Sequence, residues 1–154
     1  MERVAPLPLD VGQVVRSLFY SEKAVAKGMP VPLLCRLYFG KTLQPSRFVN
    51  PNNFPIDVAR YRRLREKFPD DLSTEEEVAE GMGEMLARIH WSPGYDGRDI
   101  EFVMGGSLRA ATVDLHVIDF NQVRVIQVRA AAIQPLHLSV RCEGSTSKAV
   151  MYRS

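Results

Sequence analysis

The stretch Val113-Asp114-Leu115-His116-Val117-Ile118-Asp119-Phe120 decides the fold. Apolar side chains at Val113, Leu115 and Val117 alternate with their neighbours, as in a β-strand with one buried face. His116 alternates with them, so we expect it at the surface. The strand ends on Asp119, and the loop Arg98-Asp99-Ile100-Glu101 lies before it. We therefore expect two carboxylates, Asp99 and Asp119, beside one small sheet.

A helix is predicted directly before that loop, over residues 73–90. Ser73 with Glu76, and Thr74 with Glu77, both have the spacing of a capping box. One helical face is apolar and carries Val78, Met82, Met85, Leu86 and Ile89. The helix would end at His90, beside Trp91 as a buried aromatic. His90 is then either a base or a helix cap that hydrogen-bonds the following loop.

Shorter elements are predicted on both sides of this segment. Asp10 would cap one helix and Ser21 would begin a second one that ends near Gly28. A strand is expected over 33–39, a Pro- and Asn-rich loop over 41–55 and a helix over 56–68. The remaining expectations are a short strand over 100–104, a turn at 105–107 and a further strand over 123–128.

Composition restricts the class of protein. A chain of 154 residues with 45% hydrophobic content is long enough for one domain with a core. The formal net charge of +2 gives no indication of a polyanion partner by itself. No apolar run approaches the roughly 20 residues that span a bilayer, and no signal-peptide layout is present. We expect no membrane partner and an intracellular, cytoplasmic or nuclear location. Cys35 and Cys142 are expected as free thiols, without zinc-ligand spacing.

The order of helix, Asp loop and strand ending in Asp-Phe resembles the C-terminal lobe of kinase-like folds. There the first Asp orients a hydroxyl and the second binds Mg²⁺. The resemblance implies an α+β fold, a truncated kinase-like C-terminal-lobe core with helices packed against short strands. Its candidate catalytic residues are Asp99, Asp119 and His90.

Several parts of the kinase-like pattern are altered. Met104 stands where an Asn is expected, Asn121 stands where the glycine after Asp-Phe is expected, and no glycine-rich phosphate loop is present. The two aspartates are therefore either structural or a working pair, with Asp96 and Glu101 as further acids nearby. No cofactor is expected, although Mg²⁺ would bind at Asp119 if the site is active.

A basic run, Arg60-Tyr61-Arg62-Arg63-Leu64-Arg65-Glu66-Lys67, lies in the helix predicted over 56–68. Arg60, Arg63 and Lys67 would share one helix face and are the candidate nucleic-acid-binding residues. A solvated helix face is the alternative. Three nearby acids would weaken the positive field, namely Asp57, Asp70 and Asp71.

A second resemblance covers about residues 3–126. It is carried by Cys35-Arg36-Leu37-Tyr38-Phe39-Gly40-Lys41, Pro45-Ser46-Arg47-Phe48, Asn53-Phe54-Pro55, Met85-Leu86-Ala87-Arg88-Ile89-His90-Trp91, Asp99-Ile100-Glu101-Phe102-Val103-Met104-Gly105 and Ile118-Asp119-Phe120. These blocks resemble the fungal domain-of-unknown-function 3669 family, whose members are often labelled zinc finger proteins. The family often occurs near genes of fungal secondary metabolism. Some relatives resemble arginine-using cyclodipeptide synthases, which take aminoacyl-tRNA.

These resemblances lead to two expectations of function. The first is a non-catalytic kinase-like binding module or a truncated gene product, in which residues 1–128 are a fragment of the family domain and 129–154 are a poorly ordered or aberrant tail. The alternative is a fragment of a tRNA-dependent, arginine-containing cyclodipeptide synthase-like enzyme, with tRNA as its partner.

Overall fold

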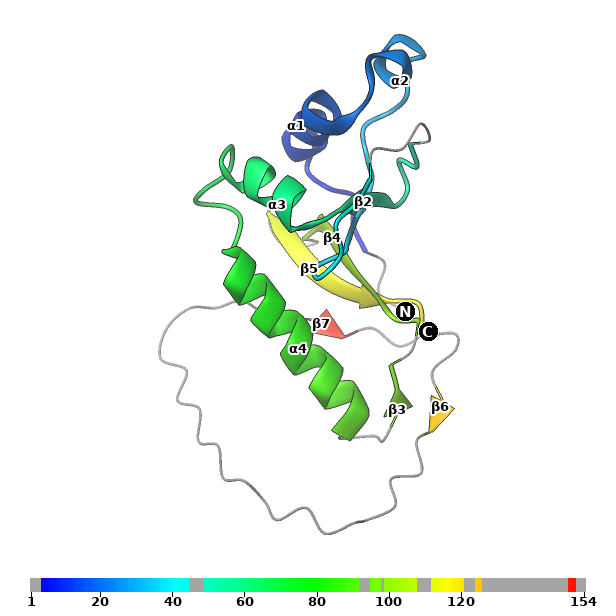
Figure 1. Ribbon diagram of the computed structural model, residues 1–154, viewed down its shortest axis with the longest axis vertical. Helices are drawn as coiled ribbons and strands as arrows, with labels where there is room; N and C mark the ends of the chain where they lie inside the picture. The colour runs from blue at the N-terminus through cyan, green and yellow to red at the C-terminus, as the bar shows by residue number, and fades with distance from the viewer. Residues whose placement is uncertain are drawn as a thin grey trace.

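The computed structural model describes residues 4–44, 49–91, 95–97, 99–107, 112–120, 124–125 and 150–151. These residues form a mixed α+β fold, which confirms the expected class (Figure 1). The element order is α1 Leu9–Phe19, α2 Glu22–Ala26, β1 Cys35–Leu37, β2 Phe54–Ile56, α3 Val58–Arg65, α4 Glu75–Trp91, β3 Tyr95–Asp96, β4 Glu101–Gly106, β5 Val113–Ile118, β6 Arg124–Val125 and β7 Val150–Met151.

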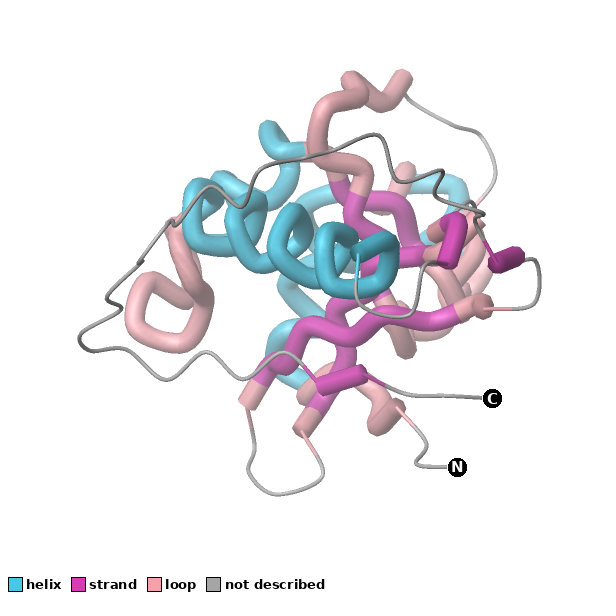
Figure 2. The backbone as a smooth tube through the Cα atoms, turned by 90° about the horizontal axis from the view of Figure 1, so that it is seen from below, coloured by secondary structure: helices cyan, strands magenta, loops and turns pink. Residues whose placement is uncertain are grey.

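Five strands make one mixed sheet in the order β2-β1-β4-β5-β7, and β3 pairs with β6 in a second, two-stranded sheet. The β4–β5 pair is antiparallel, from Glu101 opposite Ile118 to Gly106 opposite Val113. β1 runs parallel to β2 and antiparallel to β4. Helix α4 lies across this sheet, as Figures 1 and 2 show from two directions.

Strand β2 lies across the boundary between the loop predicted over 41–55 and the helix predicted over 56–68. The prediction was wrong because Phe54 and Ile56 are buried beside β1, while Pro55 stands opposite Arg36. A proline lacks the N–H that a central strand must donate, but β2 is the edge strand of the sheet, where one side of the backbone needs no partner.

The helix ends follow local capping, with one correction. Ser21 caps α2 by accepting from the Ala24 N–H, as predicted. At α4 the chain uses the second of the two predicted boxes: Glu77 N–H donates to Thr74 Oγ1 at 3.2 Å, and Thr74 N–H donates to Glu77 Oε2 at 2.8 Å. Asp10 does not cap α1, because the helix begins at Leu9 and Pro8 is the N-cap residue.

Gly105 and Gly106 do not form the predicted turn, since both belong to β4. The N-terminal segment crosses the strand there, and Gly106 N–H donates to Ala5 O at 2.8 Å. A Cβ on Gly105 would lie 2.9 Å from Ala5 O, and one on Gly106 would clash with Pro6 O. The glycines therefore serve a close backbone approach, which local sequence does not reveal.

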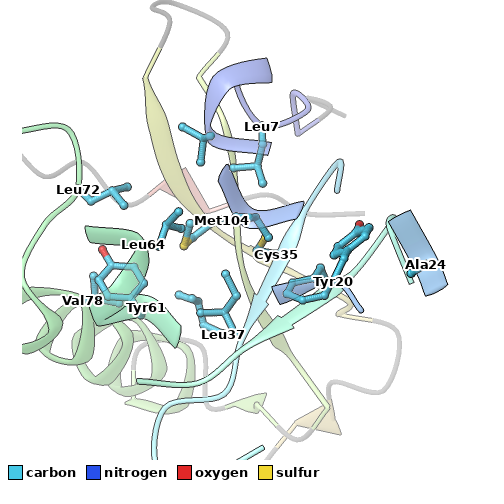
Figure 3. Packing of buried hydrophobic residues seen from close by; sticks show 14 residues of the cluster. Leu7, Tyr20, Ala24, Cys35, Leu37, Tyr61, Leu64, Leu72, Val78 and Met104 are labelled. Atoms are coloured by element: carbon cyan, nitrogen blue, oxygen red, sulfur yellow. The ribbon is translucent and has the colours of Figure 1, made fainter. Parts of the chain in front are cut away.

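The core lies between one face of the sheet and the helices. Figure 3 shows Cys35, Leu37 and Met104 from the strands meeting Tyr61 and Leu64 from α3. Leu64 is fully buried and Tyr61 is 1% exposed. The Tyr61 hydroxyl donates to Ser73 O at 2.9 Å, which ties α3 to the start of α4. A smaller cluster of Met85, Ile89 and Val117 packs the end of α4 on β5.

Two aromatic predictions were wrong. His116 is buried, at 4% exposed, because it stands opposite the buried Val103 on the second face of the sheet. His116 and Val103 are both buried on that face, so alternation with apolar neighbours gave no guide to exposure. Trp91 is 68% exposed, because it is the last residue of α4 and extends beyond the cluster that buries Ile89.

The predicted tail, residues 129–154, lies outside the described residues except for Val150–Met151. Those two form β7, which runs parallel to β5 with His116 opposite Val150. Of the strand predicted over 123–128, Arg124–Val125 are described and form β6. Among the described helices, none has the length and apolar character needed to cross a membrane.

Candidate functional site

Asp99 and Asp119 lie at the same end of the β4–β5 hairpin. The ladder ends with Glu101 opposite Ile118; Asp119 directly follows Ile118, and Asp99 comes two residues before Glu101. Paired Cα atoms in antiparallel strands are about 5 Å apart. The fold therefore places both aspartates just beyond the same end of the β4–β5 pair, and their action as a working pair stays a prediction.

Both aspartates have a backbone conformation that favours glycine. The φ angle is +69° at Asp99 and +63° at Asp119. The left-handed region costs an L-residue of order 1 kcal/mol, less for Asp and Asn than for larger side chains. Both residues are also exposed, so core packing does not require carboxylates there. Strained polar residues of this kind are often found at binding or catalytic sites.

His90, the third candidate, lies against the loop that carries Asp99. An ideal Cβ on Gly97 would lie 3.2 Å from His90 Nε2, so the imidazole faces Gly97. Ile100 N–H donates to Gly97 O at 3.3 Å, which closes a turn around Asp99. This placement favours the interpretation in which His90 supports the loop after the helix, within reach of the same end of the hairpin.

The two further acids have other partners. Asp96 stands opposite Arg124 in the β3–β6 pair. Glu101 pairs with Arg36 Nη1 and accepts from Asn53 Nδ2 at 3.0 Å, so its carboxylate links β1 and the start of β2 to β4. The Glu101 side chain is only 14% exposed. Sequence spacing did not identify Arg36 and Asn53, because both reach Glu101 through strand pairing distant in the chain.

A positive and aromatic group adjoins Glu101. The Arg36 guanidinium lies 4.8 Å from the centroid of the Tyr38 ring, and Lys41 Nζ lies 5.6 Å from the same centroid. Cations over a tyrosine ring are attracted by its negative face. Glu101 balances the charge of Arg36 through their ion pair. Lys41 is the exposed cation of the two that lie over the Tyr38 ring.

In the described part of the chain, no three His, Cys, Asp or Glu residues are grouped so that they could hold a metal ion. Cys35 is fully buried, and burial raises the pKa of its thiol well above the usual range. Cys142 lies outside the described residues. A divalent cation at this site would therefore depend on the two hairpin aspartates and on water molecules, which is ordinary for Mg²⁺.

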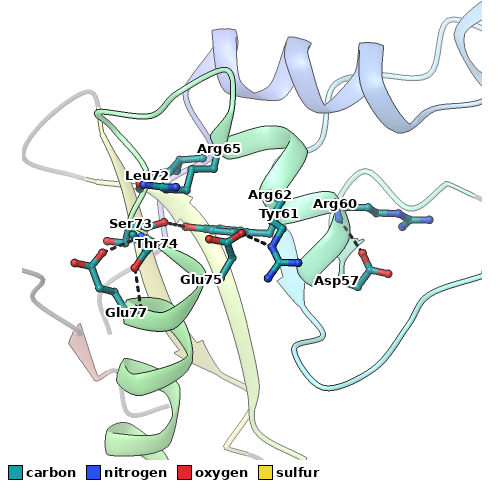
Figure 4. Close-up of polar contacts among 10 residues, drawn as sticks. All are labelled: Asp57, Arg60, Tyr61, Arg62, Arg65, Leu72, Ser73, Thr74, Glu75 and Glu77. Carbon is teal, nitrogen blue, oxygen red and sulfur yellow. Dashed lines mark hydrogen bonds and ion pairs between the residues drawn. The ribbon is translucent and has the colours of Figure 1, made fainter.

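The basic residues of α3 divide into two sets. Arg62 pairs with Glu75 at 2.7 Å and Arg65 donates to Leu72 O at 3.3 Å, so these two connect α3 to the start of α4 (Figure 4). Arg63 and Lys67, which lies beyond the end of α3, are exposed, and this exposure fits both a binding face and a solvated face. Arg60 is half-buried and donates to Pro55 O at 2.8 Å.

Asp57 controls the start of this helix. One carboxylate oxygen accepts from Arg60 N–H at 3.0 Å as the N-cap of α3, and the other accepts from Leu43 N–H at 2.9 Å. Burial alone would raise the pKa of Asp57, but these two hydrogen bonds and the Arg60 charge together hold the pKa below its usual value.

Comparison of the chain with protein-family models, with curated proteins and with solved structures found no match.

Proposed function

We propose that this chain is the C-terminal-lobe core of a kinase-like fold and acts as a non-catalytic binding module. One observation carries the proposal: α4, β3, the Asp99 turn, β4, β5, Asp119 and β6 follow one another, with β4 paired to β5 and β3 paired to β6. In kinase-like lobes, the loop with the first aspartate and the strand end with the second meet in this way.

The chemistry beside the two aspartates supports binding rather than phosphoryl transfer. The second metal ligand of a kinase-like site is an Asn five residues after the first Asp, and this position is Met104, which is fully buried in β4. Glu101 at the start of β4 is held by Arg36 and Asn53. In a phosphoryl-transfer site, the side chains at the positions of Met104 and Glu101 would have to face a metal–nucleotide complex.

The ligand that fits the end of the hairpin is a cationic group. Asp99 and Asp119 present two carboxylates from strained, exposed positions at one end of the β4–β5 pair. Carboxylates bind divalent cations through oxygen and water, and they bind ammonium or guanidinium groups through charge-assisted hydrogen bonds. In this proposal the aspartates bind the ligand and His90 supports the loop.

The experiment separates binding from catalysis. Thermal stability is measured with Mn²⁺ alone and with ATP and Mg²⁺, for the wild type, Asp119→Asn, Asp99→Asn and the exposed-loop control Asp70→Asn. We expect Mn²⁺ to raise the melting temperature of the wild type and of Asp70→Asn but of neither hairpin variant, and ATP to add nothing. No effect of Mn²⁺ on the wild type would overturn the cation site. A nucleotide-dependent stabilisation by Mg²⁺ that is lost in Asp119→Asn would refute the non-catalytic proposal.

The membership in the fungal family of unknown function is part of the same proposal, resting on the sequence blocks quoted above. A second candidate function follows from it, a fragment of a tRNA-dependent, arginine-containing cyclodipeptide synthase-like enzyme of secondary metabolism. The observation in its favour is that Arg63 on α3 and Lys67, which follows the end of this helix, are both exposed. A gel-shift assay with tRNA at low salt tests it, and the absence of any shift would remove this candidate.

A further inference from the structure

The surface where α1 meets α3 carries arginines that form no ion pair with a carboxylate within the described residues. Arg60 and Arg63 both lie over the ring of Phe19, with the guanidinium carbons 6.0 and 5.4 Å from its centroid. Phe19 is the last residue of α1 and is half-buried. The two guanidinium groups thus converge on one aromatic ring from a neighbouring helix.

Three other arginines of the described chain form ion pairs with glutamates. Arg36 is paired with Glu101, Arg62 with Glu75 and Arg88 with Glu84. Within the described residues, neither Arg60 nor Arg63 forms an ion pair with a carboxylate. The charge of Asp57 acts on Arg60, but the two carboxylate oxygens of Asp57 accept from the backbone N–H groups of Arg60 and Leu43.

Two further cations extend this surface along both helices. Lys67 comes four residues after Arg63, beyond the end of α3, and is exposed. Arg16 precedes Phe19 by one turn of α1; its Nη2 donates to Val25 O at 3.5 Å, and its buried Nε has no hydrogen-bond partner in the described part of the chain. Asp70 and Asp71 weaken the field beyond Lys67, so the field is centred on Arg60, Arg63 and Phe19.

We propose that Arg60, Arg63, Lys67 and Phe19 form a binding surface for the phosphodiester backbone of a nucleic acid. This binding surface deepens the second candidate function, and it rests on that function only for the identity of the natural ligand. Each phosphate offers several acceptor oxygens, and a guanidinium group donates to them with two parallel N–H bonds. Because Arg60 is anchored on Pro55 O and on the rings of Phe19 and Phe54, it presents its remaining donors in a fixed position. Arg63 and Lys67 supply mobile charge along the strand.

Fluorescence anisotropy with a labelled, mixed-sequence RNA of roughly 15 nucleotides tests this surface, across a range of salt concentrations. The variant is Arg63→Ala with Lys67→Ala. The matched control is Arg62→Ala with Arg88→Ala, which removes the same total charge from two exposed arginines that are paired with glutamates.

We expect about 10-fold weaker binding of the Arg63/Lys67 variant at low salt, and a salt slope reduced by roughly 1.5, because two phosphate contacts are lost. The control should bind within about 3-fold of wild type, since its charges are already balanced. Equal losses in the variant and the control would overturn the proposal, because net charge alone would then explain binding. So would the absence of wild-type binding at low salt, or competition by polyglutamate as strong as by unlabelled RNA, which would indicate an acidic protein partner.

The same assay keeps this inference apart from the second candidate function. If tRNA and mixed-sequence RNA bind equally and both depend on Arg63 and Lys67, the surface is supported and a tRNA-specific role loses its support. If tRNA binds and the Arg63/Lys67 variant binds it as well as the wild type does, the surface assignment is wrong while the candidate function stands.

Discussion

Replacement of Asp57 tests how the polar contacts of one side chain stabilise two segments of the fold. Its carboxylate caps α3 through Arg60 N–H and fixes the preceding loop through Leu43 N–H. Asp57→Ala removes the cap, which is worth about 1 kcal/mol. It also leaves the half-buried Leu43 N–H without its acceptor, which costs roughly another 1 kcal/mol. We therefore expect the free energy of unfolding to fall by about 2 kcal/mol at neutral pH.

Asp57→Ser separates the two contributions. A serine hydroxyl also caps helices but does not reach Leu43 N–H at the same time, so about half of the lost stability should return. Asp70→Ala, in an exposed loop, is the control and should change the free energy of unfolding by no more than roughly 0.5 kcal/mol. Urea unfolding followed by far-UV circular dichroism is the suitable assay, because the single tryptophan, Trp91, is already 68% exposed in the folded protein.

The difference between wild type and Asp57→Ala should also depend on pH. The folded-state pKa of Asp57 is lowered, so the unfolded chain takes up the proton first as the pH falls. The stabilisation is then complete above the ordinary aspartate pKa of about 4 and is lost as the pH falls through the folded value. A loss below about 0.5 kcal/mol in Asp57→Ala at pH 7, or a difference that grows on acidification, would refute this reasoning.

Three further predictions concern other parts of the fold. Thr74→Ala and Glu77→Ala should each lower the free energy of unfolding by about 1 kcal/mol. The double variant should lose less than the sum of the two, because the two side chains cap α4 reciprocally. Additive losses would argue against the capping box. Gly83→Ala should raise the melting temperature, because the added Cβ would meet no neighbouring residue within 4 Å and alanine favours the helix by up to about 1 kcal/mol. Gly106→Ala should lower the melting temperature, because the added Cβ would clash with Pro6 O. In a Cys142→Ser background, Cys35 should react with a thiol reagent only after unfolding, since its fully buried side chain and raised pKa leave no accessible thiolate; rapid reaction of the folded protein would show that β1 opens readily.

Features that depend on neighbouring residues could be predicted from the sequence. The alternation of Val113, Leu115 and Val117 gave β5, and the capping pattern with the apolar face gave α4. Capping and periodicity are local, because one turn of helix or one pair of strand positions contains the whole signal. For the same reason the sequence predicted that Asp99 lies in a loop and that Asp119 ends a strand, and the structure places both at one end of the β4–β5 pair.

The sequence alone did not determine which faces are covered or which strands pair. The burial of His116, the strand β2 around Pro55 and the role of Gly105 and Gly106 all depend on segments far away in the chain. The same holds for Glu101, whose partners come from β1 and from the residue before β2. The left-handed backbone at Asp99 and Asp119 follows from the way the chain leaves the paired strands, which local preferences disfavour. Tertiary structure decided these features, because the free energy of a buried contact depends on what meets in space rather than on what is adjacent in sequence.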